Sequence, residues 1–163
     1  MTVEALLKEV EQQINNLFNK PMDFTPFYHN VGKILLNSVA LQFETEGMYY
    51  QKGAPWQSLA PSTIAERKRK GFFPIRILRR RAGDAGLLGS INYQVFAVKN
   101  TLSQSQNRAG LTLSTNVFYA PYLHYGTRKM PPRIIFPSDD YLPSEDIDAI
   151  VEAAVKFFNK AMR

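Results

Sequence analysis

The chain has 163 residues, 45% of them hydrophobic, which is enough for one domain with an apolar core, and we expect a single domain over residues 1–163. It contains no cysteine, which excludes disulfides, thiolate zinc sites and cysteine nucleophiles. Its formal net charge of +6 favours a polyanionic partner. No apolar run approaches the ~20 residues that span a bilayer, and no signal-peptide core is present, so we expect cytoplasmic synthesis and no membrane partner.

The first half of the chain has the periodicity of helices. Thr2 can cap a first helix that ends near Phe18. Thr25-Pro26 begins a second helix, expected to continue to about Glu46, and a short third helix is predicted for residues 62–70. The apolar stripe of the first helix comprises Val3, Leu6, Leu7, Val10, Ile14, Leu17 and Phe18.

The second half changes to the period of strands. Residues 91–97 and 111–114 alternate apolar and polar side chains, and the polar stretch 101–110 between them is predicted to be a long hairpin loop. Residues 133–136 read as a further short strand between prolines. Ser144 begins a last helix whose expected buried stripe comprises Ile147, Ile150, Val151, Ala154, Phe157, Phe158 and Ala161. The order predicts an α+β fold: an antiparallel sheet of three to four strands packed by N-terminal and C-terminal helices, with a long hairpin loop.

Charge is segregated along the chain. A basic run between residues 66 and 81 carries a net charge of +7, so the remainder of the chain sums to −1. An acidic run between residues 139 and 152 contains six acids and no base. Such a chain can bind polyanions, or it can bind copies of itself head to tail. The basic residues are Arg67, Lys68, Arg69, Lys70, Arg76, Arg79, Arg80 and Arg81. The acidic residues are Asp139, Asp140, Glu145, Asp146, Asp148 and Glu152.

Residues able to support catalysis are sparse. His29 and His124 are the only histidines, and each is interpreted as structural. The acidic run lacks the spacing of a calcium loop, and helix-end electrostatics accounts for Glu145 and Asp146. The glycines from Gly83 to Gly89 lack the dinucleotide-binding spacing. We therefore expect no catalytic residue, no metal and no cofactor.

Five short motifs occur in order between roughly residues 40 and 137. They cover residues 56–63, 77–78, 86–91, 119–126 and 132–136. Together they resemble the phage Mu-type virion-morphogenesis proteins, which are related in role to tail-completion and neck proteins. The residues that carry the pattern are Trp56, Leu59, Thr63, Leu88, Ser90, Tyr119, His124, Gly126 and Arg133.

The resemblance implies a structural protein rather than an enzyme. Such a protein completes or terminates the tail at the head–tail junction and joins it to the neck. The implied partners are further copies in a ring, expected to be a hexamer, and proteins of the tail tube or neck. The implied location is the virion, in the tail or neck. In a ring, the basic run of one copy would meet the acidic run of the next, and the basic run is also a candidate for transient contact with packaged DNA.

Two other functions compete with this one. The first is a sequence-nonspecific nucleic-acid-binding module that grips phosphates with Arg67–Arg81. The second is a small hydrolase or metal enzyme built around His124 with Asp139 and Asp140. No groove-reading motif supports the first, and no nucleophile elbow supports the second.

Overall fold

The computed structural model describes residues 23–50, 55–79, 86–99, 107–138 and 141–161. The predicted helix at residues 2–18 and most of the predicted hairpin loop therefore lie outside the described residues. The elements are α2 (Thr25–Glu44), α3 (Pro61–Arg69), α4 (Leu87–Ser90), β1 (Ile91–Lys99), β2 (Asn107–Thr115), α5 (Ala120–Tyr125) and α6 (Ser144–Ala161).

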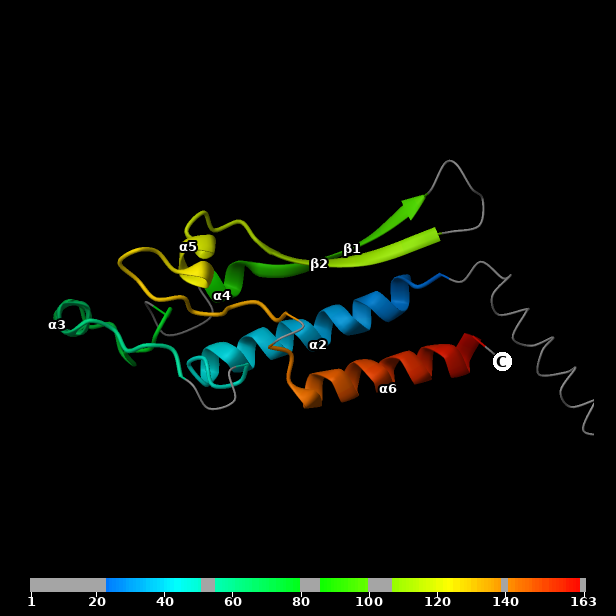
Figure 1. Ribbon diagram of the computed structural model, residues 1–163, viewed down its shortest axis with the longest axis horizontal. Helices are drawn as coiled ribbons and strands as arrows, with labels where there is room; N and C mark the ends of the chain where they lie inside the picture. Colours follow the sequence, from blue (N-terminus) through cyan, green and yellow to red (C-terminus); the bar gives the residue numbers. More distant parts are fainter. Residues whose placement is uncertain (1–22, 51–54, 80–85, 100–106, 139–140, 162–163) are drawn as a thin grey trace, which may run out of the picture.

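Helix α2 is the central layer of the molecule (Figure 1). The β1–β2 hairpin covers one side of α2, and α6 runs antiparallel to α2 along the other side. At one end of this stack lie α4 and α5, and α3 extends beyond them. The predicted α+β class is confirmed. In the described part of the chain, α2 packs between α6 and a two-stranded hairpin.

The sheet is smaller than the sequence predicted. In the described part of the chain it has two antiparallel strands, in the register Ile91↔Thr115 to Lys99↔Asn107, instead of three to four. Residues 107–110, predicted as loop, belong to β2. The period-two prediction for β1 is confirmed, since its side chains alternate between partly buried and exposed through Phe96.

The predicted strand at Arg133–Phe136 is wrong, because other groups occupy its backbone. Its first N–H, that of Arg133, donates to the Leu123 carbonyl at 2.8 Å. The N–H groups of Ile135 and Phe136 both point to Nδ1 of His124, at 3.0 and 3.4 Å. Prolines on both sides of this segment contribute no N–H. The segment is extended, but it is bonded to side chains and to α5 rather than to a strand.

Helix α2 approaches the hairpin closely at Gly32. A Cβ atom at this position would lie 2.4 Å from the Tyr93 ring on β1, so only glycine allows this contact. At its start, α2 receives no cap from Thr25. Asp23 Oδ1 instead accepts the Thr25 N–H at 2.9 Å, so a carboxylate just before the helix bonds to its first N–H group.

The apolar core lies where the C-terminal half of α2 meets the base of the hairpin. Phe43 and Trp56 pack edge to face with ring centroids 5.4 Å apart. Their neighbours come from segments far apart in the sequence. The buried core residues are Val39, Phe43, Trp56, Ile77, Leu87, Ile91, Ala120 and Ile135.

Gln42 is a fully buried polar residue of α2 that joins three segments. Its Nε2 donates to the Ile134 carbonyl, and its Oε1 accepts from the Tyr50 N–H, both at 2.9 Å. Both ends of the amide are therefore satisfied, which is the condition for burying it without a large penalty. The extended segment after α5 is fixed to α2 by this side chain.

A second polar contact fixes α6 to α2. Asp146 is buried, and its Oδ2 accepts from Ser38 Oγ at 2.5 Å while its Oδ1 accepts from the Tyr49 hydroxyl at 3.0 Å. Burial, together with the bond to Asp146, raises the pKa of Tyr49 to about 12, so this phenol remains a donor at neutral pH. At the other end of α6, Phe157 packs on Phe24 with ring centroids 5.4 Å apart.

The predicted buried stripe of α6 is only partly correct. Ile150, Ala154 and Phe157 are partly buried, whereas Ile147, Val151, Phe158 and Ala161 are exposed. The apolar stripe is wider than the surface that α2 covers, so one edge of it faces outward.

The Gln42 amide generates a stability prediction. Gln42→Leu keeps the shape of the side chain roughly constant but leaves the Ile134 carbonyl and the Tyr50 N–H without partners, so the free energy of unfolding should fall by about 2–4 kcal/mol. Urea denaturation followed by circular dichroism measures this change. The same substitution at exposed Gln94 is the control and should change stability by less than about 0.5 kcal/mol. Equal effects at the two positions would contradict the assigned role of Gln42.

His124 generates a prediction about pH. Burial lowers the pKa of His124 below its ordinary value, and its Nδ1 accepts backbone hydrogens only when it is unprotonated. Below pH ~6.5 the unfolded chain therefore binds a proton that the folded chain resists, and stability falls as pH decreases. His124→Asn keeps an acceptor but cannot titrate, so the loss of stability between pH 7 and ~5 should become shallower.

Thermal denaturation across this pH range measures the effect of His124. His29→Asn, at the exposed histidine, controls for the loss of a histidine elsewhere in the chain. An unchanged pH dependence in His124→Asn would overturn the assignment.

Candidate functional site

An exposed cluster of aromatic rings surrounds α5. Tyr119, Tyr122 and Tyr125 recur every three residues, which places them near one another on a short helix, while Ala120 on the other side is buried. Phe118 precedes them and is 84% exposed, and Tyr125 is 79% exposed. We call Phe118, Tyr119, Tyr122 and Tyr125 the aromatic surface. Exposed apolar groups gathered in this way make the aromatic surface a candidate for contact with another protein.

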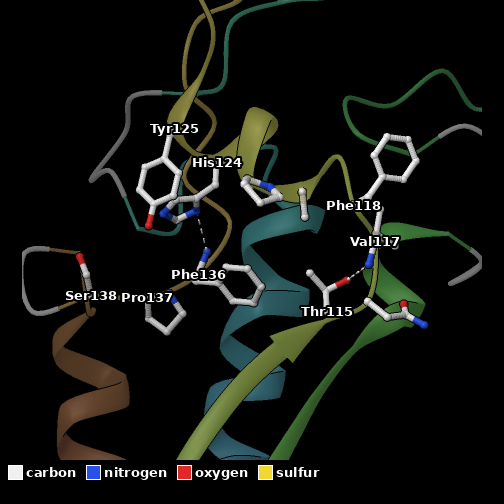
Figure 2. A pocket seen from close by; sticks show the side chains of 11 residues that line it. Thr115, Val117, Phe118, His124, Tyr125, Phe136, Pro137 and Ser138 are labelled. Carbon is white, nitrogen blue, oxygen red and sulfur yellow. Dashed lines mark hydrogen bonds between the residues drawn. The ribbon is translucent and has the colours of Figure 1, made fainter.

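A pocket opens beside the aromatic surface. It has a volume of about 540 Å³ and lies between α5, the end of β2 and the extended segment that follows Arg133. Figure 2 shows the His124 and Tyr125 rings side by side on one wall, Phe136 and Pro137 below them, and Val117 on the opposite side. The lining is mostly apolar and carries no cluster of charged groups, so the pocket is suited to an apolar side chain of a partner.

A tight turn projects next to the aromatic surface. Thr127 and Met130 bond to each other through both backbone groups, at 2.8 and 3.1 Å, which leaves Arg128 and Lys129 exposed at the tip. Gly126 begins the turn with φ of 76°, and a Cβ there would lie 2.7 Å from the Pro132 nitrogen. Glycine is therefore required at a position that the family motif had singled out.

The basic run divides into structural and exposed members. Arg67 Nη1 donates to the carbonyls of Arg76 and Arg79, at 2.6 and 2.8 Å, and so closes the turn between them. Lys70 pairs with Glu66 on α3. Lys68, Arg69 and Lys70 are exposed, whereas Arg76 and Arg79 are partly buried. Arg80 and Arg81 lie outside the described residues.

The acidic run divides in the same way. Asp146 is buried against α2 and is not available to a partner. Glu145, Asp148 and Glu152 are exposed on α6, and Glu152 pairs with Lys156 at 2.6 Å. Asp139 and Asp140 lie outside the described residues. Helices α3 and α6 lie at different places on the molecule, so the exposed cations and the exposed acids are separate (Figure 1).

Most of the motif residues organise the core instead of forming a surface. Trp56 is buried, Leu59 and Leu88 pack against the core, and Thr63 on α3 is partly buried. Ser90 Oγ lies 2.6 Å from Thr115 Oγ1 and ties the start of β1 to the end of β2. Tyr119 differs from the rest, since it belongs to the aromatic surface.

Arg133 is a buried cation within this group. Its Nη2 donates to the Gln57 carbonyl at 3.2 Å, which connects the extended segment to the loop before α3. Burial lowers the pKa of Arg133. The motif therefore identified residues that hold the end of the molecule together.

The sequence analysis did not identify Phe118, Tyr122 and Tyr125 as a binding surface. The signal was present, because the rings of Phe118, Tyr119, Tyr122 and Tyr125 follow one another around Pro121 without a strand period. The aromatic composition of the segment and Pro121 predict a turn or a short helix for residues 118–126, and α5 confirms the helix. Which rings face outward depends on α5 burying Ala120 and Leu123, and local sequence does not specify that choice.

Catalytic groups do not gather in the described residues. No group of three or more His, Asp or Glu side chains there is arranged to hold a metal ion. His29 lies 3.5 Å from the Tyr93 hydroxyl, and His124 is bonded to backbone, so the two histidines are in different parts of the fold. No helix in the described part of the chain is both long and apolar enough to cross a bilayer.

Comparison with known proteins gives one match. The model of the phage virion morphogenesis family matches residues 5–120, which include the core motif residues and the start of the aromatic surface. His124, Gly126 and Arg133 lie beyond the matched residues. No curated protein and no solved structure matches the chain at a significant level. Because the family model covers well over half of the chain, the chain belongs to the phage virion morphogenesis family.

Proposed function

We propose that this protein is a non-enzymatic subunit of a ring at the head–tail junction or tail end of a phage or prophage virion. In this proposal the ring, expected to be a hexamer, completes or terminates the tail and joins it to the neck, and its partners are tail-tube or neck proteins. Family membership supports a role in virion assembly. The observation that supports the rest is the aromatic surface, whose four rings are between 40% and 84% exposed.

Closed rings require two different surfaces on each subunit. A head-to-tail contact joins one surface of a subunit to another surface of the next, and ring closure uses every copy of both. The aromatic surface and its pocket supply an apolar contact, which must hold the ring together because exposed ion pairs contribute only about 0–1 kcal/mol each. Phe118 and Tyr125 are the rings with most area to bury.

Charged side chains can orient the two copies in the same contact. The exposed cations of α3, Lys68 and Arg69, lie on a different element from the exposed acids of α6, Asp148 and Glu152. Opposite charges on separate elements steer two copies into a head-to-tail arrangement and raise the association rate. The charge therefore sets the register, and burial of the aromatic rings sets the affinity.

Nucleic-acid binding remains the second candidate because Lys68 and Arg69 at the end of α3, and Lys70 directly after it, are exposed cations, of which Lys70 pairs with Glu66. Phosphate contact requires such clusters. However, Arg67 is bonded to backbone carbonyls, so the number of cations available to phosphates is smaller than the sequence suggests.

The aromatic surface generates the main test of the proposal. The purified wild-type chain should form rings as its concentration rises, and Tyr122→Glu/Tyr125→Glu should weaken assembly at least about tenfold, because charge cannot enter a buried contact. Light scattering and negative-stain images measure both outcomes. Phe96→Ser removes a ring that is 45% exposed on the hairpin, away from the aromatic surface, and should leave assembly unchanged. A wild-type chain that stays monomeric at all concentrations and on isolated tails would contradict the proposal.

The separated charges generate a second test. Lys68→Glu/Arg69→Glu should weaken assembly roughly tenfold at low salt and less at high salt, since the lost attractions are screened. Combining it with Asp148→Lys/Glu152→Lys should restore assembly, because both signs are then reversed. Sedimentation at two salt concentrations measures this, with duplex DNA binding measured in parallel. Failure of the combined variant to recover, with loss of DNA binding, would favour the nucleic-acid alternative.

A further inference from the structure

Helix α6 is the element of the described chain that can face the aromatic surface of a neighbouring copy. A head-to-tail contact that buries the aromatic surface requires a second apolar surface on each copy, because ion pairs alone cannot hold it. Outside the aromatic surface, Met48, Phe73 and Phe96 are exposed apolar side chains of the described chain, and each comes from a different segment. On α6, in contrast, several exposed apolar side chains gather on one helix.

Three of these side chains form a row along α6. Ile147, Val151 and Val155 recur every four residues, which makes them neighbours on one face, and they are 46%, 55% and 51% exposed. We call these three residues the α6 row. Phe158 is not a member, because it packs on Phe24. The other side of α6 packs on α2, so the row is the apolar part of the helix that a partner can reach.

The residue types of the α6 row indicate burial in a contact. Ile and Val have β-branched side chains, which lower helix propensity relative to Ala, Glu or Lys. At exposed positions of a helix they also leave apolar area in water. Both costs are offset when another molecule covers the row.

The acids beside the α6 row favour a partner with positive charge. Asp148 and Glu152 are exposed, and each lies three residues before a valine of the row, which places both acids along one edge of it. The exposed cations Lys68 and Arg69 lie on α3, at the end of the molecule that also contains α5 (Figure 1). A copy that packs its aromatic surface on the α6 row of the next copy therefore brings its cations toward these acids.

We propose that the α6 row of one copy is the surface that binds the aromatic surface of the next, with a side chain of the row in the pocket beside α5. This inference rests on the proposed ring. The pocket has a volume of about 540 Å³, and its lining includes Val117, Phe118, Tyr125 and Phe136. A row of apolar side chains on a helix fits such a hollow, as when an amphipathic helix binds in an apolar groove. Because α5 lies at the base of the hairpin and α6 on the other side of α2, one copy can use both surfaces at once (Figure 1).

A variant with a charged α6 row tests this contact. Val151→Glu/Val155→Glu should weaken assembly at least about tenfold, as Tyr122→Glu/Tyr125→Glu does, because charge cannot enter a buried contact. Lys160→Glu is the matched control. It changes the net charge by the same two units and lies exposed on the same helix, about 180° around the axis from Val151, so assembly should be unchanged. Circular dichroism checks that each variant folds.

Mixing the two assembly-defective variants tests which surfaces meet. Each variant keeps the surface that the other has lost, so the mixture should form one-to-one dimers that do not grow into rings. Each variant alone should stay monomeric. Light scattering measures the size, and native mass spectrometry identifies the two chains, at a concentration well above that at which the wild type assembles.

The outcomes separate this inference from the proposed ring. Dimers of either variant alone would overturn the inference, since like surfaces would then pair, and a mixture that stays monomeric would also overturn it. Rings of Val151→Glu/Val155→Glu as stable as those of the wild type would overturn the inference and leave the proposed ring standing. A wild-type chain that never assembles would contradict the ring itself, and the inference with it.

Discussion

The fold depends on a buried amide that joins parts of the chain 92 residues apart. Gln42 is fully buried in a helix, where its side chain bonds to the carbonyl of Ile134 and to the N–H of Tyr50. The extended segment fixed in this way also donates hydrogen bonds to His124, from the N–H groups of Ile135 and Phe136 to Nδ1. The orientation of α5, and therefore of its rings, follows from a polar contact in the core. Polar groups buried with every bond satisfied specify one arrangement where apolar packing alone would tolerate several.

The molecule keeps apolar surface at two separate places. One is the aromatic surface with its pocket, at the end where α4 and α5 meet, and the other is the outer edge of α6. A small domain of this kind buries its apolar groups incompletely by itself, because its surface is large relative to its volume. For a member of the phage virion morphogenesis family this is a useful property. Apolar surfaces that are exposed in the free subunit can be buried in contacts with other proteins.

Local periodicity predicted the longer elements of the fold. Helices α2, α3 and α6 and the hairpin lie close to their predicted positions, because each has a local apolar pattern and a recognisable beginning. The strand expected at residues 133–136 failed because its hydrogen bonds go to His124, which local pattern does not reveal. Charge counting failed in a related way. Arg67 and Asp146 were counted with surface charge, yet one closes a turn and the other bonds to α2. In all three cases the deciding contact joins residues beyond the reach of local periodicity.

Helix α3 buries none of its residues, and the contact that closes the turn behind it is the guanidinium of Arg67 on two carbonyls. An element held in this manner separates from its domain at a small fraction of the global unfolding free energy. We therefore expect α3 to open at a lower denaturant concentration than α2 and the hairpin. The exposed Lys68 and Arg69 therefore lie on a weakly attached helix, whose position can change when the subunit contacts a partner.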